Sequence, residues 1–303
     1  MNTLIKSLKS LFSSNNEFIA LARTGKRITH IALAIPFVIV FIIAASVISF
    51  IPGQLIANNF ELSKAFIAFY NLFVSFGFVI VLVWLWVKFF EKRSFKSLGF
   101  VLNGAFKKYM KGFISGLVML GIVLLLIVVF GQVRLEDNPV TFNLNVLGTI
   151  ILLLVGYIVQ GAAEEIVARG WQFQVIAARY KPWLGAVISS VIFALLHGFN
   201  SGISIIALIN LFLFAVLLII FILYDRSIWA ACGWHTAWNW TMENIFGLKV
   251  SGTEGIVSVF KFSTQGPDYI TGGNFGPEGS ILSSIVLLAG IFVLLILESR
   301  KIK

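Results

Sequence analysis

Residues 146–170 read VLGTIILLLVGYIVQGAAEEIVARG, and this stretch decides how the rest of the chain is interpreted. Its first thirteen residues are almost entirely apolar, as in a membrane-spanning helix. The following turns add two adjacent carboxylates, Glu164 and Glu165, and a guanidinium, Arg169. Ionisable groups inside a membrane helix are costly, so they are rare and usually functional. The stretch therefore predicts a membrane helix that carries a buried polar site.

The composition supports a membrane protein. The chain has 303 residues, of which 59% are hydrophobic and 12% charged, whereas a soluble domain has roughly 25% charged residues. Apolar runs of about 20 residues, the length that crosses a bilayer, recur along most of the sequence. We expect an all-α, polytopic bundle of about eight transmembrane helices in the cell membrane, with no separate soluble domain.

The distribution of basic residues predicts the orientation. The formal net charge is +10, from 23 Lys and Arg against 13 Asp and Glu. If the loops alternate sides, all but four of the 23 lie on one side; the exceptions are Lys64, Arg134, Lys249 and Lys261. This positive-inside pattern makes both termini cytoplasmic. The basic charge then sets topology and contacts anionic lipid, so it calls for no nucleic-acid partner.

The chain divides into four expected segments. They are an interfacial N-terminal segment (1–29), accessory transmembrane helices (30–144), a catalytic helical core (145–246), and an outer loop with the last helix and a basic tail (247–303). The expected spans are 31–51, 64–87, 112–133, 147–180, 183–199, 203–224, 228–246 and 281–297. Pro52 should end the first span, and Pro139 should interrupt the loop after the third. Partial alternation over 255–262 suggests a small hairpin in the outer loop. The apolar spacing in 1–29 fits a short surface helix, with a flexible tail as the alternative.

The two glutamates have different expected roles. Glu165 and Arg169 are four residues apart, so they share a helix face and can pair. Glu164 lies about 100° further round the helix. One carboxylate is thus neutralised within its own helix, and the other is free for general acid–base chemistry.

Later helices supply further polar groups. His197 lies near the end of the fifth span, while His235 and Asn239 lie on one face of the seventh. Together with a glutamate they would provide a general base, a water-positioning group and oxyanion donors. A single intramembrane His or Asn is more often an interhelical hydrogen-bonding group, and a Glu–Arg pair can be structural, so the case for chemistry rests on their joint occurrence. Among the acidic residues we expect only Glu164, Glu165 and Glu243 within spans, Glu243 being structural or at the outer surface. We expect six tryptophans to be interface anchors and packing groups: Trp171, Trp183, Trp229, Trp234, Trp238 and Trp240.

The motifs Glu164-Glu165-x-x-x-Arg169, Phe193-x-x-x-His197 and His235-x-x-x-Asn239 resemble the three signatures of the CPBP intramembrane proteases. That family includes the CAAX prenyl-protein endoproteases of the Ras-converting type and the bacterial Abi proteins. The resemblance covers residues 156–240. It implies an eight-helix membrane endopeptidase, with a cavity open to the cytoplasm, that acts on a membrane protein or peptide.

The resemblance also implies a role for each motif residue. Glu164 would be the general base that activates a water held by His197. His235 and Asn239 would stabilise the oxyanion, and Glu165 and Arg169 would orient the site. No metal is required by this mechanism. A zinc site made of Glu164, His197, His235 and water stays open as an alternative, although the sequence has no His-Glu-x-x-His pattern.

Two other function classes remain. One is a non-catalytic membrane protein of the bacteriocin self-immunity or regulatory type, in which the 247–280 loop either meets an outer-face partner or is a plain linker. The other, weaker reading is a transporter with the carboxylates as proton sites, which predicts inverted repeats that the sequence lacks.

The depth of the two histidines in the membrane is a separate question. His197 lies roughly 20 Å along its helix from Pro182, and His235 roughly 10 Å from Ile228. The two imidazoles therefore meet only if the helices tilt or begin at different depths.

Overall fold

The structure is a computed structural model that describes residues 2–130, 133–136 and 143–302. Within these residues, six helical runs are long and apolar enough to cross a membrane: Ile31–Asn59, Lys64–Glu91, Ala105–Val129, Leu144–Arg179, Ile205–Asp225 and Ile281–Lys301. One shorter helix, α9 (Pro182–Leu196), is also apolar, and α11 (Trp229–Trp240) is a further short helix of the bundle. The protein is therefore an all-α, multi-pass membrane bundle, and the total of eight spans stays a prediction.

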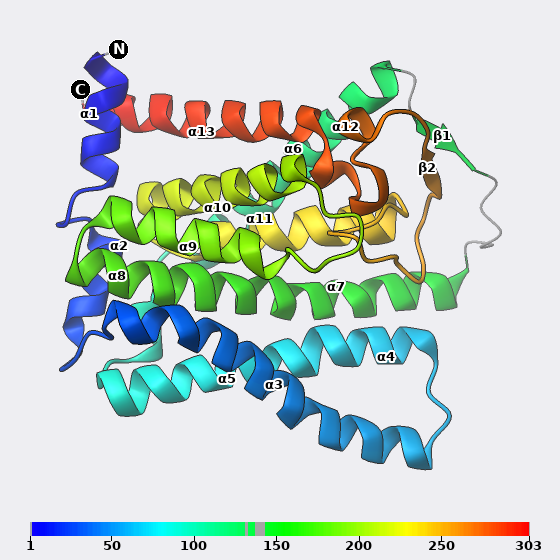
Figure 1. Cartoon of the computed structure of the whole chain (residues 1–303), viewed down its shortest axis with the longest axis horizontal. Helices are drawn as coiled ribbons and strands as arrows, with labels where there is room; N and C mark the ends of the chain where they lie inside the picture. Colours follow the sequence, from blue (N-terminus) through cyan, green and yellow to red (C-terminus); the bar gives the residue numbers. More distant parts are fainter. Residues whose placement is uncertain (1, 131–132, 137–142, 303) are drawn as a thin grey trace.

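The bundle is arranged around one long helix. This helix comprises α7 (Leu144–Glu165), a π-helical stretch η5 (Ile166–Phe173) and α8 (Gln174–Arg179). One side of it faces α3 (Ile31–Asn59) and the run α4 (Lys64–Tyr70), η2 (Asn71–Ser75), α5 (Phe76–Leu85) and η3 (Trp86–Glu91) (Figure 1). The other side faces α9, α10 (Ile205–Asp225) and α11, with α6 (Ala105–Val129) and α13 (Ile281–Lys301) beyond. The long helix thus connects the two halves of the bundle.

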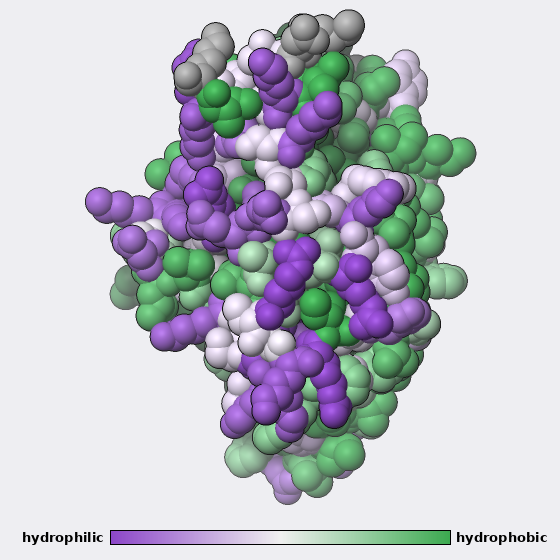
Figure 2. All heavy atoms as spheres, turned by 90° about the vertical axis from the view of Figure 1, so that its left-hand side faces the viewer, coloured by the Kyte–Doolittle hydropathy of each residue, from purple (hydrophilic) through white to green (hydrophobic). Residues whose placement is uncertain are grey.

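Both chain ends lie at the same end of the bundle, which we call the terminal face (Figure 1). Hydrophilic side chains gather there (Figure 2), as the charge distribution predicts; a cytoplasmic location for this face stays a prediction. The N-terminal segment is helical, with α1 (Asn2–Leu11), α2 (Glu17–Ala20) and η1 (Leu21–Thr24). Leu11 is buried, and the Ser10 hydroxyl donates to Glu298 Oε1 over 2.8 Å. The segment is therefore docked against α13, and the flexible-tail alternative is wrong.

Pro52 does not end the first span. α3 continues through Pro36 and Pro52 to Asn59. A proline inside a helix removes one backbone hydrogen bond, and membrane helices tolerate this where nearby groups satisfy the freed carbonyls. Here the Tyr70 hydroxyl donates to the Ser49 carbonyl over 2.7 Å, next to the interrupted turn. Pro139, the other expected breaker, lies outside the described residues.

The expected hairpin over 255–262 is also wrong. Strand β2 (Phe262–Thr264) pairs antiparallel with β1 (Val133–Leu135), which lies between α6 and α7. Lys261 Nζ lies 3.4 Å from Glu136 Oε2. Hydrogen bonds from Ser263 and Lys261 hold the pKa of Glu136 below its ordinary value. Alternation alone indicated a strand but could not identify its partner.

The rest of the 247–280 loop is anchored by Glu278, which is buried. One carboxylate oxygen accepts from Trp238 Nε1 on α11 over 3.0 Å. The other accepts from the backbone N–H and the hydroxyl of Ser251, over 2.7 and 2.8 Å. Asn200 Nδ2 then donates to the Ser251 carbonyl over 2.9 Å. The loop is thereby fixed over the ends of α9 and α11.

Helices α6 and α11 pack backbone to backbone. A Cβ added at Gly112 would lie 1.8 Å from the Ala230 carbonyl oxygen, and one at Gly233 would lie 2.1 Å from the Tyr109 carbonyl oxygen. Small residues at such interfaces let membrane helices approach closely. α11 is therefore held rigidly against α6 along one face, and its other face is directed at α7.

A second buried ionic group lies near the terminal face. Glu91 and Arg93 are buried, with Arg93 Nε 2.6 Å from Glu91 Oε2. Glu91 Oε1 also accepts from the Thr29 hydroxyl over 2.5 Å and from Trp171 Nε1 over 3.0 Å. Glu91, the last residue of the helical run Lys64–Glu91, is thus a buried acidic residue beyond the three that we expected within spans. Glu91 was not singled out from the sequence because it lies among the basic residues of 88–96.

The tryptophans are divided between the two expected roles. Trp171, Trp234 and Trp238 are almost completely buried, whereas Trp183 is 56% exposed. Burying an indole requires a partner for its N–H, and Trp171 and Trp238 each donate to a buried glutamate, as described above. These buried residues therefore take the expected packing role, and Trp171 and Trp238 also hold polar groups inside the bundle.

Candidate active site

The site begins where α7 changes to π-helix. Glu164 and Glu165 end the α-helical part, and Arg169 lies in the wider η5 turn that follows. Short π-helical segments frequently occur at functional sites. All three residues lie well inside the bundle, because the helix runs on for ten residues beyond Arg169 to Arg179.

Glu165 is the neutralised carboxylate. It and Arg169 have no exposed side-chain surface, and Arg169 Nη1 lies 3.0 Å from Glu165 Oε1. The same oxygen accepts from His235 Nδ1 over 2.9 Å. The Arg169 guanidinium also lies over the Phe193 ring, 4.1 Å from its centroid, where a cation is attracted to the aromatic face. The expected Glu165–Arg169 pair is therefore present, and it extends to α11 and α9.

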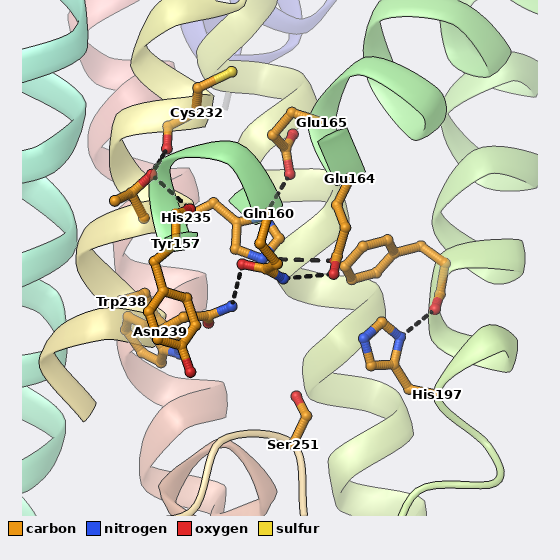
Figure 3. Close-up of polar contacts among 12 residues, drawn as sticks. Tyr157, Gln160, Glu164, Glu165, His197, Cys232, His235, Trp238, Asn239 and Ser251 are labelled. Atoms are coloured by element: carbon orange, nitrogen blue, oxygen red, sulfur yellow. Dashed lines mark hydrogen bonds and ion pairs between the residues drawn. The ribbon is translucent and has the colours of Figure 1, made fainter. Parts of the chain in front are cut away.

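Glu164 has a different environment. Its side chain keeps 19% of its surface exposed. One carboxylate oxygen accepts from Gln160 Nε2 over 2.5 Å. The other lies 3.7 Å from His235 Nε2. His235 thus lies between the two carboxylates, with one ring nitrogen toward each (Figure 3).

Gln160 connects Glu164 to the third motif. Asn239 Nδ2 donates to Gln160 Oε1 over 3.2 Å, and Gln160 in turn donates to Glu164 (Figure 3). Gln160 was not among the site residues predicted from the sequence. The signal was present, because Gln160 lies four residues before Glu164 and therefore shares its helix face.

His197 caps the C-terminal end of α9 and contributes a second imidazole. Its Nδ1 lies 2.8 Å from the Phe193 carbonyl oxygen, which can only accept, so Nδ1 carries the proton. Nε2 of the neutral ring is then a hydrogen-bond acceptor. Phe193, one turn earlier on α9, has its ring centroid 6.5 Å from that of His235, and His197 and His235 line one cavity. The two helices therefore bring their motif residues together.

A cavity of about 440 Å³ joins these groups. Glu164, Gln160, His197, His235 and Asn239 all line it. Glu165 and Arg169 lie behind this wall. The remaining walls come from α3, η2 and α5 on one side and from the Val250–Thr253 part of the loop on the other. Five polar side chains from three helices therefore face one mostly apolar chamber.

Glu243 does not belong to this chamber. It is buried, is hydrogen-bonded to Tyr157, and lies against Gly255 of the loop. The structural part of the expectation agrees with this position. The outer-surface part is wrong, because the 247–280 loop covers Glu243, which lies in the π-helical turn η6 (Thr241–Ile245) after α11.

The zinc alternative can be compared with the geometry. Among the described residues, no three His, Cys, Asp or Glu side chains converge as a metal-binding group. His235 uses Nδ1 for Glu165, while His197 uses Nδ1 for a carbonyl. The three residues of the alternative set, Glu164, His197 and His235, line the same cavity without forming a cluster.

Comparison with known proteins gives one family match, within the segment that carries the site. Residues 146–241 match the family described as Rce1-like type II CAAX prenyl endopeptidases. This segment contains all three motifs and every polar residue of the chamber from Gln160 to Asn239. The match confirms the resemblance to the CPBP and CAAX proteases that the motifs indicated. A search of curated proteins found no match, and a search of solved structures found none either.

The fold and the family match together support a membrane protease of the CAAX type, embedded in a lipid bilayer and acting on protein substrates. The matched segment is about a third of the chain. The first two membrane helices, which form the opposite wall of the cavity, lie outside it.

Proposed function

We propose that this protein is a glutamate-dependent intramembrane endopeptidase in which Glu164 is the general base. The observation that carries the proposal is the division of labour between the two adjacent carboxylates. Glu165 is buried and paired with Arg169 and His235, whereas Glu164 faces the cavity and keeps accessible surface. A base must reach the proton that it removes, and of the two only Glu164 borders the space where water and substrate fit.

His197 is suited to hold the nucleophilic water. With Nδ1–H donating to the Phe193 carbonyl, Nε2 accepts a hydrogen bond from that water. Glu164 accepts the second proton and removes it as the oxygen attacks the scissile carbonyl. The proton then passes to the leaving amine, so the carboxylate is regenerated.

His235 and Asn239 are suited to the oxyanion. With Nδ1–H donating to Glu165, His235 donates from Nε2 only in its imidazolium form. In that form the site contains two carboxylates, Arg169 and one imidazolium, and its formal charge is zero. Asn239 uses one amide hydrogen for Gln160 and retains the other. Donors fixed before the reaction are the largest single contribution in many enzymes.

The test uses purified protein in lipid nanodiscs and a pool of mixed-sequence, internally quenched peptides. Half of the pool carries a farnesylated C-terminal cysteine motif. Replacing Glu164 by Gln should lower kcat by a factor of about 10²–10⁴, the usual contribution of general-base catalysis. Glu254→Gln is the matched control, because it removes an exposed carboxylate in the loop and should leave the rate unchanged. Wild-type rates in the Glu164→Gln protein would overturn the proposal.

A further inference from the structure

A second cavity, of about 1060 Å³, lies between the later half of α3 and α4. We call it the α3–α4 cleft. It begins at the turn that joins these helices, on the face opposite the termini (Figure 1). Its lining is polar for a membrane protein, and the side chains that matter here are Ser49, Gln54, Asn58, Glu61, Asn71 and Ser75. Polar groups inside a bilayer usually face a bundle interior or a water-filled space.

The cleft adjoins the active-site cavity. Ser46 and Ser75 line both spaces. At this boundary the Ser49 and Ser75 hydroxyls lie 2.9 Å apart, so a hydrogen bond between α3 and η2 lies where the two spaces meet. Polar side chains therefore extend from the face opposite the termini to the edge of the cavity that contains Glu164.

The backbone is irregular along this path. Pro52 has no backbone N–H to donate within α3, and Asn71–Ser75 of η2 is π-helical. Irregular backbone at membrane depth is tolerated only where protein buries it or water reaches it. Asn71 and Gln54 are exposed rather than buried. Both walls of the cleft thus have the features expected of a hydrated passage.

On the other side of the active-site cavity, the described residues are tightly packed. Phe41 and Trp171 are in edge-to-face contact, with ring centroids 5.2 Å apart. Trp171 is fully buried and donates to the ionic group of Glu91 and Arg93. Trp171 lies beyond Glu164 along the long helix, toward its end at Arg179. The family resemblance implied an opening toward the cytoplasm, where the termini are expected, whereas the groups of this layer are buried and none of them lines the cavity.

We propose that the α3–α4 cleft is the substrate path, and that the substrate is an extended polypeptide segment entering from the face opposite the termini. This inference rests on the proposed peptidase function. An extended segment carries unpaired backbone N–H and C=O groups, which cost several kcal/mol each in hydrocarbon if left unsatisfied. The amide and hydroxyl side chains of the cleft can satisfy them. The Ser49–Ser75 contact separates as the segment passes.

The first experiment measures hydration without using activity. Variants with one added cysteine are treated in intact cells, from outside, with a permanently charged methanethiosulfonate trimethylammonium reagent. The native Cys232 is buried and stays in place. Asn71→Cys and Gln54→Cys should react as fast as Lys261→Cys on the exposed loop. Ile43→Cys, on the 58% exposed lipid side of α3, should react about 100-fold more slowly, because a charge costs about 3 kcal/mol to place in the bilayer. Slow labelling of both cleft positions, or labelling only from the terminal face, would overturn the path.

The second experiment measures passage. In nanodiscs, Ser75→Cys coupled to the same reagent should cleave the quenched peptide pool at least about tenfold more slowly than unmodified Ser75→Cys, because the added group fills the junction. Reduction should restore the rate, and modified Lys261→Cys should cleave normally. Unchanged cleavage after complete modification at position 75 would show that substrate uses another route. The labelling result does not depend on Glu164. The Glu164→Gln assay therefore tests the peptidase proposal, and the labelling experiment tests the path separately.

Discussion

Replacing Gly112 by Ala tests whether α11 is as rigidly held as the structure indicates. The new Cβ would lie 1.8 Å from the Ala230 carbonyl oxygen, where ordinary contact begins at 3.4 Å. The two helices must therefore separate locally by the difference, about 1.6 Å. The atoms of α11 that the new methyl group would meet are the backbone atoms of Ala230, so no side chain can rotate away to make room. A gap of even 0.5–1 Å forfeits a quarter to a half of the dispersion attraction between the surfaces.

The expected cost is about 3 kcal/mol of unfolding free energy, at the upper end of the range for overpacked sites. The matched control is Gly121→Ala on the same helix, where an added Cβ has nothing within 4 Å. There the alanine should stabilise the protein by up to about 1 kcal/mol through helix propensity. Unfolding in mixed micelles at increasing dodecyl sulfate, followed by the fluorescence of the buried tryptophans, gives both values.

The same substitution should also reduce cleavage per folded molecule. A shift of α11 changes the 2.9 Å contact between His235 Nδ1 and Glu165 Oε1 and moves Asn239 with it. If Gly112→Ala is as stable and active as Gly121→Ala, then α6 and α11 do not pack as closely as described, and their contact does not position His235 and Asn239.

Four further outcomes are expected. Glu91→Gln should lower the unfolding free energy by about 3–5 kcal/mol, because it leaves the buried Arg93 charge unpaired; thermal unfolding with an activity assay at low temperature measures this separately from catalysis. Gln160→Ala should lower kcat about tenfold with little change in KM, since a hydrogen bond to a charged group contributes about 1.5–3 kcal/mol, and steady-state kinetics on the quenched peptide pool would detect it. Treating the wild type with 1,10-phenanthroline should leave cleavage unchanged, and loss that zinc restores would support the metal alternative instead. The pKa of Glu136 is lower in the folded protein than its ordinary value of 4.5. The stabilisation of the β1–β2 contact by Glu136 is therefore fully present above pH 4.5 and is lost as the pH falls through the lower folded-state pKa. Limited proteolysis at residues 262–264 should accelerate only in that acidic range.

The fold class followed from the sequence because hydrophobic length is a direct physical requirement of the bilayer. The Glu165–Arg169 pair followed from helix periodicity, which needs no tertiary information. The end of α3 was missed because proline usually stops a helix in water, and here Tyr70 supplies a hydrogen bond from a neighbouring helix.

Other features depend on contacts between distant parts of the chain. The pairing of β2 with β1 joins residues about 130 apart in sequence, so local alternation could not reveal it. Glu91 lies in a strongly basic stretch, and only the fold shows that Thr29, Arg93 and Trp171 surround it. Gln160 could have been found from spacing, but a glutamine in a membrane helix is also a common packing contact between helices.

The walls of the active-site cavity come from two parts of the chain, and this affects how the substrate preference of such a protein can evolve. The groups that we propose to be catalytic all lie within the matched residues 146–241, whereas Val38, Ser46 and Ser75 of the facing wall lie in the first two membrane helices. Mutations in those helices can reshape what the chamber accepts without disturbing the acid–base chemistry. Substrate preference can therefore drift between relatives that share the three motifs, and exchanging residues 31–91 between them is a direct way to transfer it.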